Sequence, residues 1–183
     1  MIVLAALAAL ISGLSKGWGP KGVTPVAVGG DFQANVAMKT GQVDAFVEAS
    51  ALGLQLEEKQ EGRLLLSAAD YVHDFHIHVI FASDKLIKAQ PEAIKSFLKG
   101  WFETIAFMRR NKEETVRIAR RITGFDQPVE EREYDLVMPM FSVDGKFEQK
   151  ALATLGRSFV ELGLLDQEPD MSSLYTERFL PGS

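Results

Sequence analysis

The sequence contains no cysteine among its 183 residues. This absence excludes disulfide bonds, thiolate nucleophiles and cysteine-based metal sites. A basic excess is also missing, because 20 lysines and arginines stand against 25 aspartates and glutamates and give a net charge of −5. Such a balance provides no electrostatic attraction for nucleic acid or for an anionic membrane surface. We therefore predict that the chain has no nucleic-acid partner.

Long apolar runs and catalytic signatures are absent as well. The apolar stretch at 2–11 is too short to span a bilayer as a helix, and it lacks the preceding positive charge of an export signal. Gly29 and Gly30 lack the lysine and Ser/Thr partner of a phosphate-binding loop. No Ser/His/Asp set stands out, and no two carboxylates are brought together by their spacing. We therefore predict a protein that is not an enzyme, with no catalytic residue and no cofactor.

The first part of the sequence alternates between helix and strand patterns. Leucines at helical spacing over 4–14 predict a buried, alanine-rich helix. Short, mainly apolar runs predict strands at 23–28, 43–47, 63–67 and 76–82. Helices are expected between them at 31–40 and 51–59. This alternation is typical of a parallel or mixed sheet with helices on its faces.

The second part predicts helices almost exclusively. Pro91 opens an amphipathic helix that runs to about Arg110. Further helices are expected over 112–122, 129–138 and 148–162. The apolar stripe of the first helix includes Phe97, Trp101 and Ile105 and needs a surface to bury it. We therefore keep open a homodimer, formed through exposed helical surface or by exchange of elements between copies.

Four short motifs stand in order along the chain: Gly-Gln-Val-Asp-Ala over 41–45, Pro-Glu-Ala-Ile-Lys-Ser-Phe-Leu over 91–98, Asn-Lys-Glu-Glu-Thr-Val over 111–116, and Gly-Leu-Leu over 163–165. Together they resemble the substrate-binding proteins of ABC transporters of the nitrate, sulfonate, taurine and bicarbonate type, which have the type II periplasmic binding protein fold. Lys112 stands where that family usually has proline.

The resemblance implies an α/β fold of the type II periplasmic-binding-protein kind, with one nearly complete α/β lobe and a mainly helical C-terminal remainder of the other lobe. We expect lobe two over 1–75, lacking its first strand, and the return hinge with the helical part of lobe one over 76–183. The chain would then be an N-terminally incomplete member of the family.

The implied function is non-catalytic capture of a small nitrogen- or sulfur-containing organic solute between two lobes. The solute class would be that of nitrate, sulfonates, taurine or thiamine precursors, delivered to an ABC permease of the inner membrane. The family is periplasmic or anchored on the outer side of the membrane, although no export signal is visible in this chain.

Ligands of open α/β sheets bind where strands end and helices begin. Gly30, Asp31 and Phe32 follow the first expected strand, and Glu48 and Ser50 follow the second. We predict that these five residues contact the ligand, with Glu48 foremost on the strength of the resemblance. Simpler interpretations stay open: Asp31 as a helix cap, Phe32 as a core residue, and Glu48 as a surface carboxylate favoured by a helix start.

Two further residues, Tyr71 and His76, are predicted to contact the ligand from the hinge. His76 belongs to an H-x-x-H-x-H pattern with His73 and His78, which could hold a metal if a further ligand were present. We favour the interpretation that backbone carbonyls hydrogen-bond these histidines, and we predict no metal. The negative charge of Asp31 and Glu48 disfavours a bare anion and favours a ligand with an amine or ring N–H donors.

Two alternatives from other functional classes remain open. One is a biosynthetic enzyme on the same scaffold, in the thiamine pyrimidine or menaquinone pathway; the pyrimidine-forming relatives use a cysteine-rich motif that this chain lacks. The other is a truncated relative that dimerises and no longer binds solute.

Overall fold

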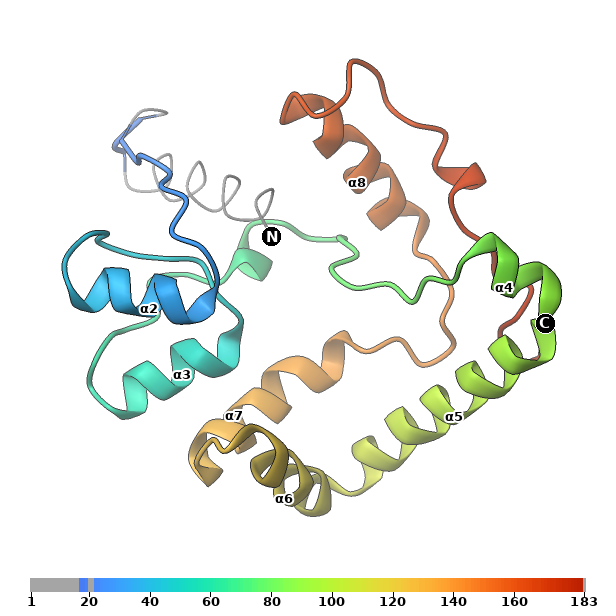
Figure 1. Cartoon of the computed structure of the whole chain (residues 1–183), viewed down its shortest axis with the longest axis horizontal. Helices are drawn as coiled ribbons and strands as arrows, with labels where there is room; N and C mark the ends of the chain where they lie inside the picture. The colour runs from blue at the N-terminus through green and yellow to red at the C-terminus, as the bar shows by residue number, and fades with distance from the viewer. Residues whose placement is uncertain (1–16, 20–21, 183) are drawn as a thin grey trace. The chain divides into compact units, whose positions relative to one another are not determined.

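A computed structural model describes residues 17–19 and 22–182 (Figure 1). The chain divides into two compact units, Met1–Val72 and His73–Ser183, which we treat separately. The helix expected over 4–14 lies outside the described residues.

The first unit is built around two short helices, α2 (Asp31–Lys39) and α3 (Ser50–Glu58), followed by the 3₁₀ turn η1 (Ala68–Asp70). Ala34 and Ala37 are buried on α2, and Leu54 and Leu56 on α3. Gly41 follows α2 with a φ of 72°, a left-handed conformation that glycine adopts without steric cost. Both predicted helices are thus confirmed to within one residue at each end.

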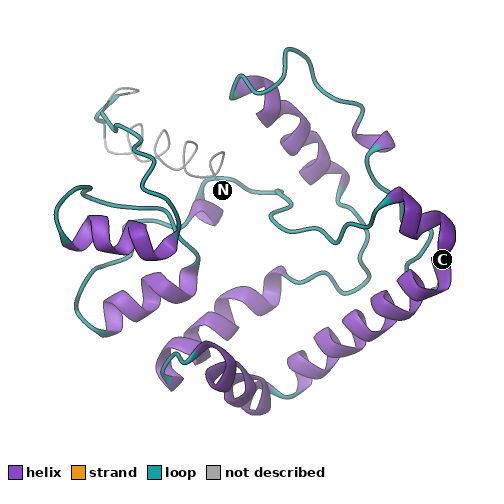
Figure 2. Ribbon diagram, viewed as in Figure 1, coloured by secondary structure: helices purple, strands orange, loops and turns teal. Residues whose placement is uncertain are grey.

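No β-strand occurs among the described residues, as Figure 2 shows by the absence of strand colour. The strands predicted at 23–28, 43–47, 63–67 and 76–82 are therefore wrong for this structure, and the nearly complete α/β lobe is not observed. The local reason is visible in the hydrogen bonds: the Val43 N–H donates to the Ala37 carbonyl, and the Leu64 N–H donates to Glu57 Oε1. A strand requires a neighbouring chain segment to pair with, and apolar β-branched composition alone does not supply it.

The second unit is helical. Its elements are α4 (Asp84–Ala89), α5 (Pro91–Arg110), α6 (Lys112–Thr123), α7 (Gln127–Val137), η2 (Met138–Met140), α8 (Gln149–Glu161) and η3 (Met171–Ser173). Pro91 occupies the first turn of α5, where its missing N–H costs no hydrogen bond. Gly124 ends α6 with a φ of 77°. The four long helices match the predicted ones closely, whereas α4 was not predicted.

A polar corner joins the C-terminal end of α5 to α7 and η2. Arg109 donates through Nη2 to the carbonyls of Met138, at 3.2 Å, and Phe141, at 2.7 Å. The Tyr134 hydroxyl donates to the Met108 carbonyl at 2.7 Å. Because these carbonyls lie at or just beyond helix ends, they have capacity to accept side-chain hydrogen bonds, and these bonds connect the end of α5 to α7 and η2.

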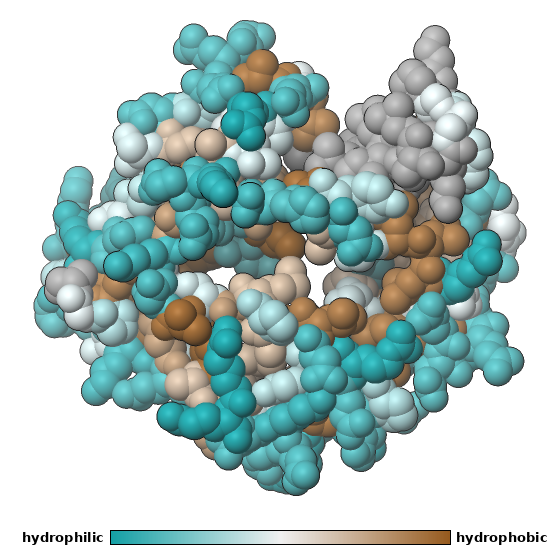
Figure 3. Space-filling view, turned by 180° about the vertical axis from the view of Figure 1, so that it is seen from behind, coloured by the Kyte–Doolittle hydropathy of each residue, from teal (hydrophilic) through white to brown (hydrophobic). Residues whose placement is uncertain are grey.

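The apolar stripe of α5 is only partly covered by its own unit. Ile105 is buried, whereas Phe97 and Trp101 remain exposed. The Phe97 and Trp101 rings stack with centroids 6.4 Å apart, and Trp101 also contacts Phe141, with centroids 6.3 Å apart. Figure 3 shows apolar residues reaching the surface in several places on the face in view. The homodimer expected from this stripe stays a prediction.

Candidate functional site

A hollow of the first unit lies beside α2, and we call it the α2 pocket. Its volume is about 450 Å³, within the range of small-molecule sites. It is bounded by the segment 26–28, by α2 and by the turn after α2. The lining residues are Val26, Ala27, Val28, Phe32, Gln33, Val36, Ala37, Gln42 and Val43.

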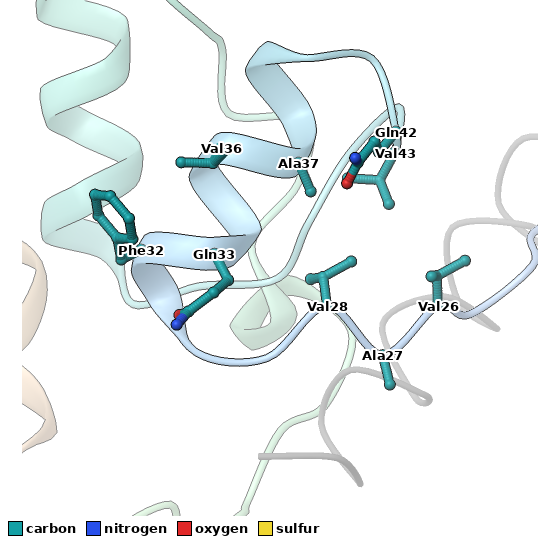
Figure 4. A pocket seen from close by; sticks show the side chains of 9 residues that line it. All are labelled: Val26, Ala27, Val28, Phe32, Gln33, Val36, Ala37, Gln42 and Val43. Atoms are coloured by element: carbon teal, nitrogen blue, oxygen red, sulfur yellow. The ribbon is translucent and has the colours of Figure 1, made fainter.

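The polar lining of the α2 pocket consists of two amides, from Gln33 and Gln42, among apolar side chains. Figure 4 shows Gln33 and Ala37 on the flank of α2 that faces Val28, with Gln42 beyond the end of the helix. Each glutamine amide has both an acceptor oxygen and two N–H donors. The pocket can therefore hold an uncharged or weakly polar group by hydrogen bonds while its apolar part lies against the valines.

Of the predicted ligand residues, Phe32 lines the α2 pocket, although its ring is 76% exposed and projects from the other flank of α2 (Figure 4). The interpretation of Phe32 as a core residue is thus wrong. Gly30 is the N-cap of α2, and its carbonyl accepts the Ala34 N–H at 2.9 Å. Asp31 is the first residue of the helix rather than its cap, so the predicted capping role is off by one position. Gly30 adjoins the pocket in sequence but is not among its lining residues.

Glu48 and Ser50 lie at the start of α3. Ala49 is the N-cap, and its N–H donates to Glu48 Oε1 at 2.7 Å. Ser50 is the first residue of the helix. The carboxylate thus sits beside the positive end of the α3 dipole, where negative charge is stabilised. Neither residue lines the α2 pocket.

Tyr71 and His76 fall in different units. Tyr71 follows η1 and is exposed. His76 belongs to the helical unit, where its Nε2 accepts the Glu148 N–H at 3.2 Å and its ring meets Phe147 edge-on, with centroids 5.3 Å apart. The imidazole thus holds the chain at His76 against Phe147 and Glu148, the two residues that precede α8.

Neither a metal site nor a membrane span emerges from the part of the chain that the structure describes. No cluster of three or more His, Asp or Glu side chains there could hold a metal ion. No helix within that part is long and apolar enough to cross a bilayer.

The residues that sequence reasoning missed are the two glutamines. Gln42 stands inside the Gly-Gln-Val-Asp-Ala motif, and Gln33 lies one turn along α2 from Gly30. Neither glutamine directly follows the end of an expected strand, where the ligand contacts were predicted. The motif itself was the available signal, since it places a polar side chain directly after the helix that forms one wall.

Comparison with known proteins identifies the family. The family model described as NMT1/THI5 like matches residues 4–115, more than half of the chain, and this range includes every residue that lines the α2 pocket. No curated protein and no solved structure matches the chain. The match implies a periplasmic-binding-protein-like fold. The chain belongs to the NMT1/THI5-like family, the family of the nitrate-, sulfonate- and taurine-type ABC substrate-binding proteins.

Proposed function

We propose that the chain is the solute-binding component of an ABC import system for a small nitrogen- or sulfur-containing organic solute. The observation that carries the proposal is the family match over the residues that build the α2 pocket. In this role the protein captures its solute without chemistry and presents it to a permease of the inner membrane. Its place of action is the periplasm or the outer side of the membrane, as the family suggests.

The α2 pocket is our candidate for the solute contact within the first unit. Gln33 and Gln42 provide acceptor oxygens for N–H donors of a solute, and Val28 and Ala37 provide apolar contact. Asp31 at the start of α2 and Glu48 before α3 add negative charge to the same unit. A solute with an amine or a ring N–H fits this set better than a bare anion.

A thermal-shift screen of the purified chain tests this proposal. The panel comprises taurine, alkylsulfonates, nitrate, small amines and aminopyrimidines. A ligand present at 100 times its Kd stabilises the folded state by about 2.7 kcal/mol. We expect one class to raise Tm and the others to leave it unchanged.

A matched pair of substitutions assigns the binding to the pocket. Gln42→Leu removes the amide from the pocket wall, whereas Gln167→Leu makes the same change at an exposed position of the helical unit. The Tm increase should fall in the first variant and persist in the second. If no solute class raises Tm in the unmodified chain, the solute-binding proposal is refuted.

The second candidate is a biosynthetic role, because the matched family also covers the biosynthetic THI5 proteins. The chain has no cysteine to build the cysteine-rich motif of the pyrimidine-forming relatives. An enzyme would convert the molecule that stabilises it, and incubation followed by mass spectrometry would detect a product. Recovery of the unchanged solute supports the binding role.

A further inference from the structure

A second cavity, separate from the α2 pocket, lies between α6 and α7 in the helical unit; we call it the α6–α7 cavity. Its volume is about 140 Å³. Val116 of α6 and Val137 of α7 contribute to its apolar walls, and Met138 lies at one end. The residues beyond 115 fall outside the family match. The cavity therefore needs an explanation of its own.

Two carboxylates line the α6–α7 cavity, from Glu130 and Glu133, which lie one turn apart on the same face of α7. Glu130 is only 5% exposed, and its Oε1 accepts a short hydrogen bond from the Thr123 hydroxyl. The Oε2 atom of Glu133 is buried and has no hydrogen-bond partner. One acceptor in this small apolar cavity is thus left unsatisfied.

The neighbouring cations do not compensate this charge. Arg109 is committed to the carbonyls at the polar corner, Lys112 forms an ion pair with Asp135 at 2.5 Å, and Arg120 donates to Gln127. Within the described part of the chain, no ion pair joins a lysine, arginine or histidine to Glu130 or Glu133. A buried carboxylate oxygen without a hydrogen-bond partner is unfavourable, so a guest that donates hydrogen bonds and carries positive charge would be preferred here.

The carboxylates and apolar side chains that line the cavity restrict the kind of cation that it can bind. Calcium takes six to eight oxygen ligands and magnesium an octahedron of them, and two carboxylates in an apolar cavity do not supply either. A short alkylammonium ion matches both parts, because its N–H groups can donate to the carboxylates while its carbon chain lies against Val116 and Val137. At about 140 Å³ the cavity has room for a short alkyl chain such as that of butylammonium.

We propose that the α6–α7 cavity is a binding site for a small primary alkylammonium ion, held by Glu133 and Glu130. The site belongs to the helical unit alone, so it does not depend on the solute proposed for the α2 pocket. A guest here would contact both α6 and α7 and stabilise their packing. The chain would then have a second ligand site, in the helical unit, besides the α2 pocket.

The test is a titration of the full chain with butylammonium chloride, followed by ¹H–¹⁵N NMR. We expect saturable shifts of the amides of α6 and α7. Glu133→Gln keeps the size of the side chain and removes the charge, and it should weaken binding about tenfold or more, as expected for loss of a charged hydrogen-bond partner. Glu131→Gln is the matched control: Glu131 lies two positions before Glu133 on α7, accepts from Gln127 and does not line the cavity. This control should bind as the unmodified chain does.

Two further titrations make the outcome decisive. Butan-1-ol has the same carbon chain without the positive charge and should produce no saturable shift, and sodium chloride at equal ionic strength should produce none either. Absence of saturation by butylammonium would overturn the proposal, as would equal binding by the Glu133→Gln variant or by butan-1-ol. Loss of solute binding in Gln42→Leu with butylammonium binding intact would separate this site from the α2 pocket.

Discussion

Truncation of one buried and one exposed leucine tests how the first unit is built. Leu54 on α3 is 1% exposed, whereas Leu65 lies in a segment predicted as a buried strand and is 58% exposed. Both are changed to alanine, so the chemical change is identical. The structure predicts very different consequences because only Leu54 gives up contacts inside a core.

The expected magnitudes follow from burial. Removing a fully buried leucine side chain costs its transfer free energy plus a cavity term, together about 2.7–5.0 kcal/mol. At the exposed Leu65, most of the side chain is in water in both states, so a change of about 0.5 kcal/mol or less is expected. The difference between the two variants should therefore be at least about 2 kcal/mol.

The assay is equilibrium urea unfolding followed by tryptophan fluorescence. The chain has two tryptophans, Trp18 in the first unit and Trp101 in the second, so Trp101→Phe leaves a probe of the first unit. With an m-value of about 1–3 kcal/mol per molar urea, Leu54→Ala should lower the midpoint by roughly 1–5 M. Equal destabilisation by Leu65→Ala would refute the description of 63–67 as an exposed, unpaired segment and would restore a buried strand there.

Two predictions concern the helical unit. Gly145 has a φ of 78°, and a Cβ there would lie 2.5 Å from Phe102 Cζ, so Gly145→Ala should destabilise this unit by about 1–3 kcal/mol in the same urea assay. Gly100→Ala in α5 is the control, because a Cβ there meets nothing within 4 Å. It should be neutral or stabilise the unit by up to about 1 kcal/mol. The Lys146 N–H donates to Asp144 and lowers the pKa of this carboxyl below its usual value of 3.8. Because the folded-state pKa is the lower one, this stabilisation is fully present above about pH 4 and is lost as the pH falls through the folded-state pKa. Asp144→Asn should therefore flatten the pH dependence of Tm below pH 4, and an unchanged profile would contradict the assignment.

The helices could be predicted from the sequence because their signals are local. Pro91 at the first turn of α5 and Gly124 after α6 are read directly from the chain, and the apolar periodicity between them completes the pattern. The strands could not be predicted in the same way. A run such as 63–67 has the composition of a strand, but whether it becomes one depends on a pairing partner elsewhere in space.

The candidate site was predicted only in outline. Phe32, which was predicted to contact the ligand, lines the α2 pocket, whereas Gln33 and Gln42 were not predicted. The emphasis on charge led to Glu48, which instead accepts the N–H of its neighbour Ala49 and stands outside the pocket lining. His76 accepts a hydrogen bond from the N–H of Glu148, 72 positions away, and no local sequence pattern predicts such a long-range partner.

The most direct test of the central claim is a ¹H–¹⁵N NMR titration of the full chain with the solute class that raises Tm. We predict saturable shifts concentrated on the α2 pocket, including the side-chain amides of Gln33 and Gln42. Gln42→Leu should abolish the saturable binding, whereas Gln167→Leu should leave it unchanged. Saturable binding that leaves residues 26–43 unshifted would contradict the assignment of the site. Failure of the whole panel to bind would contradict the proposed function itself.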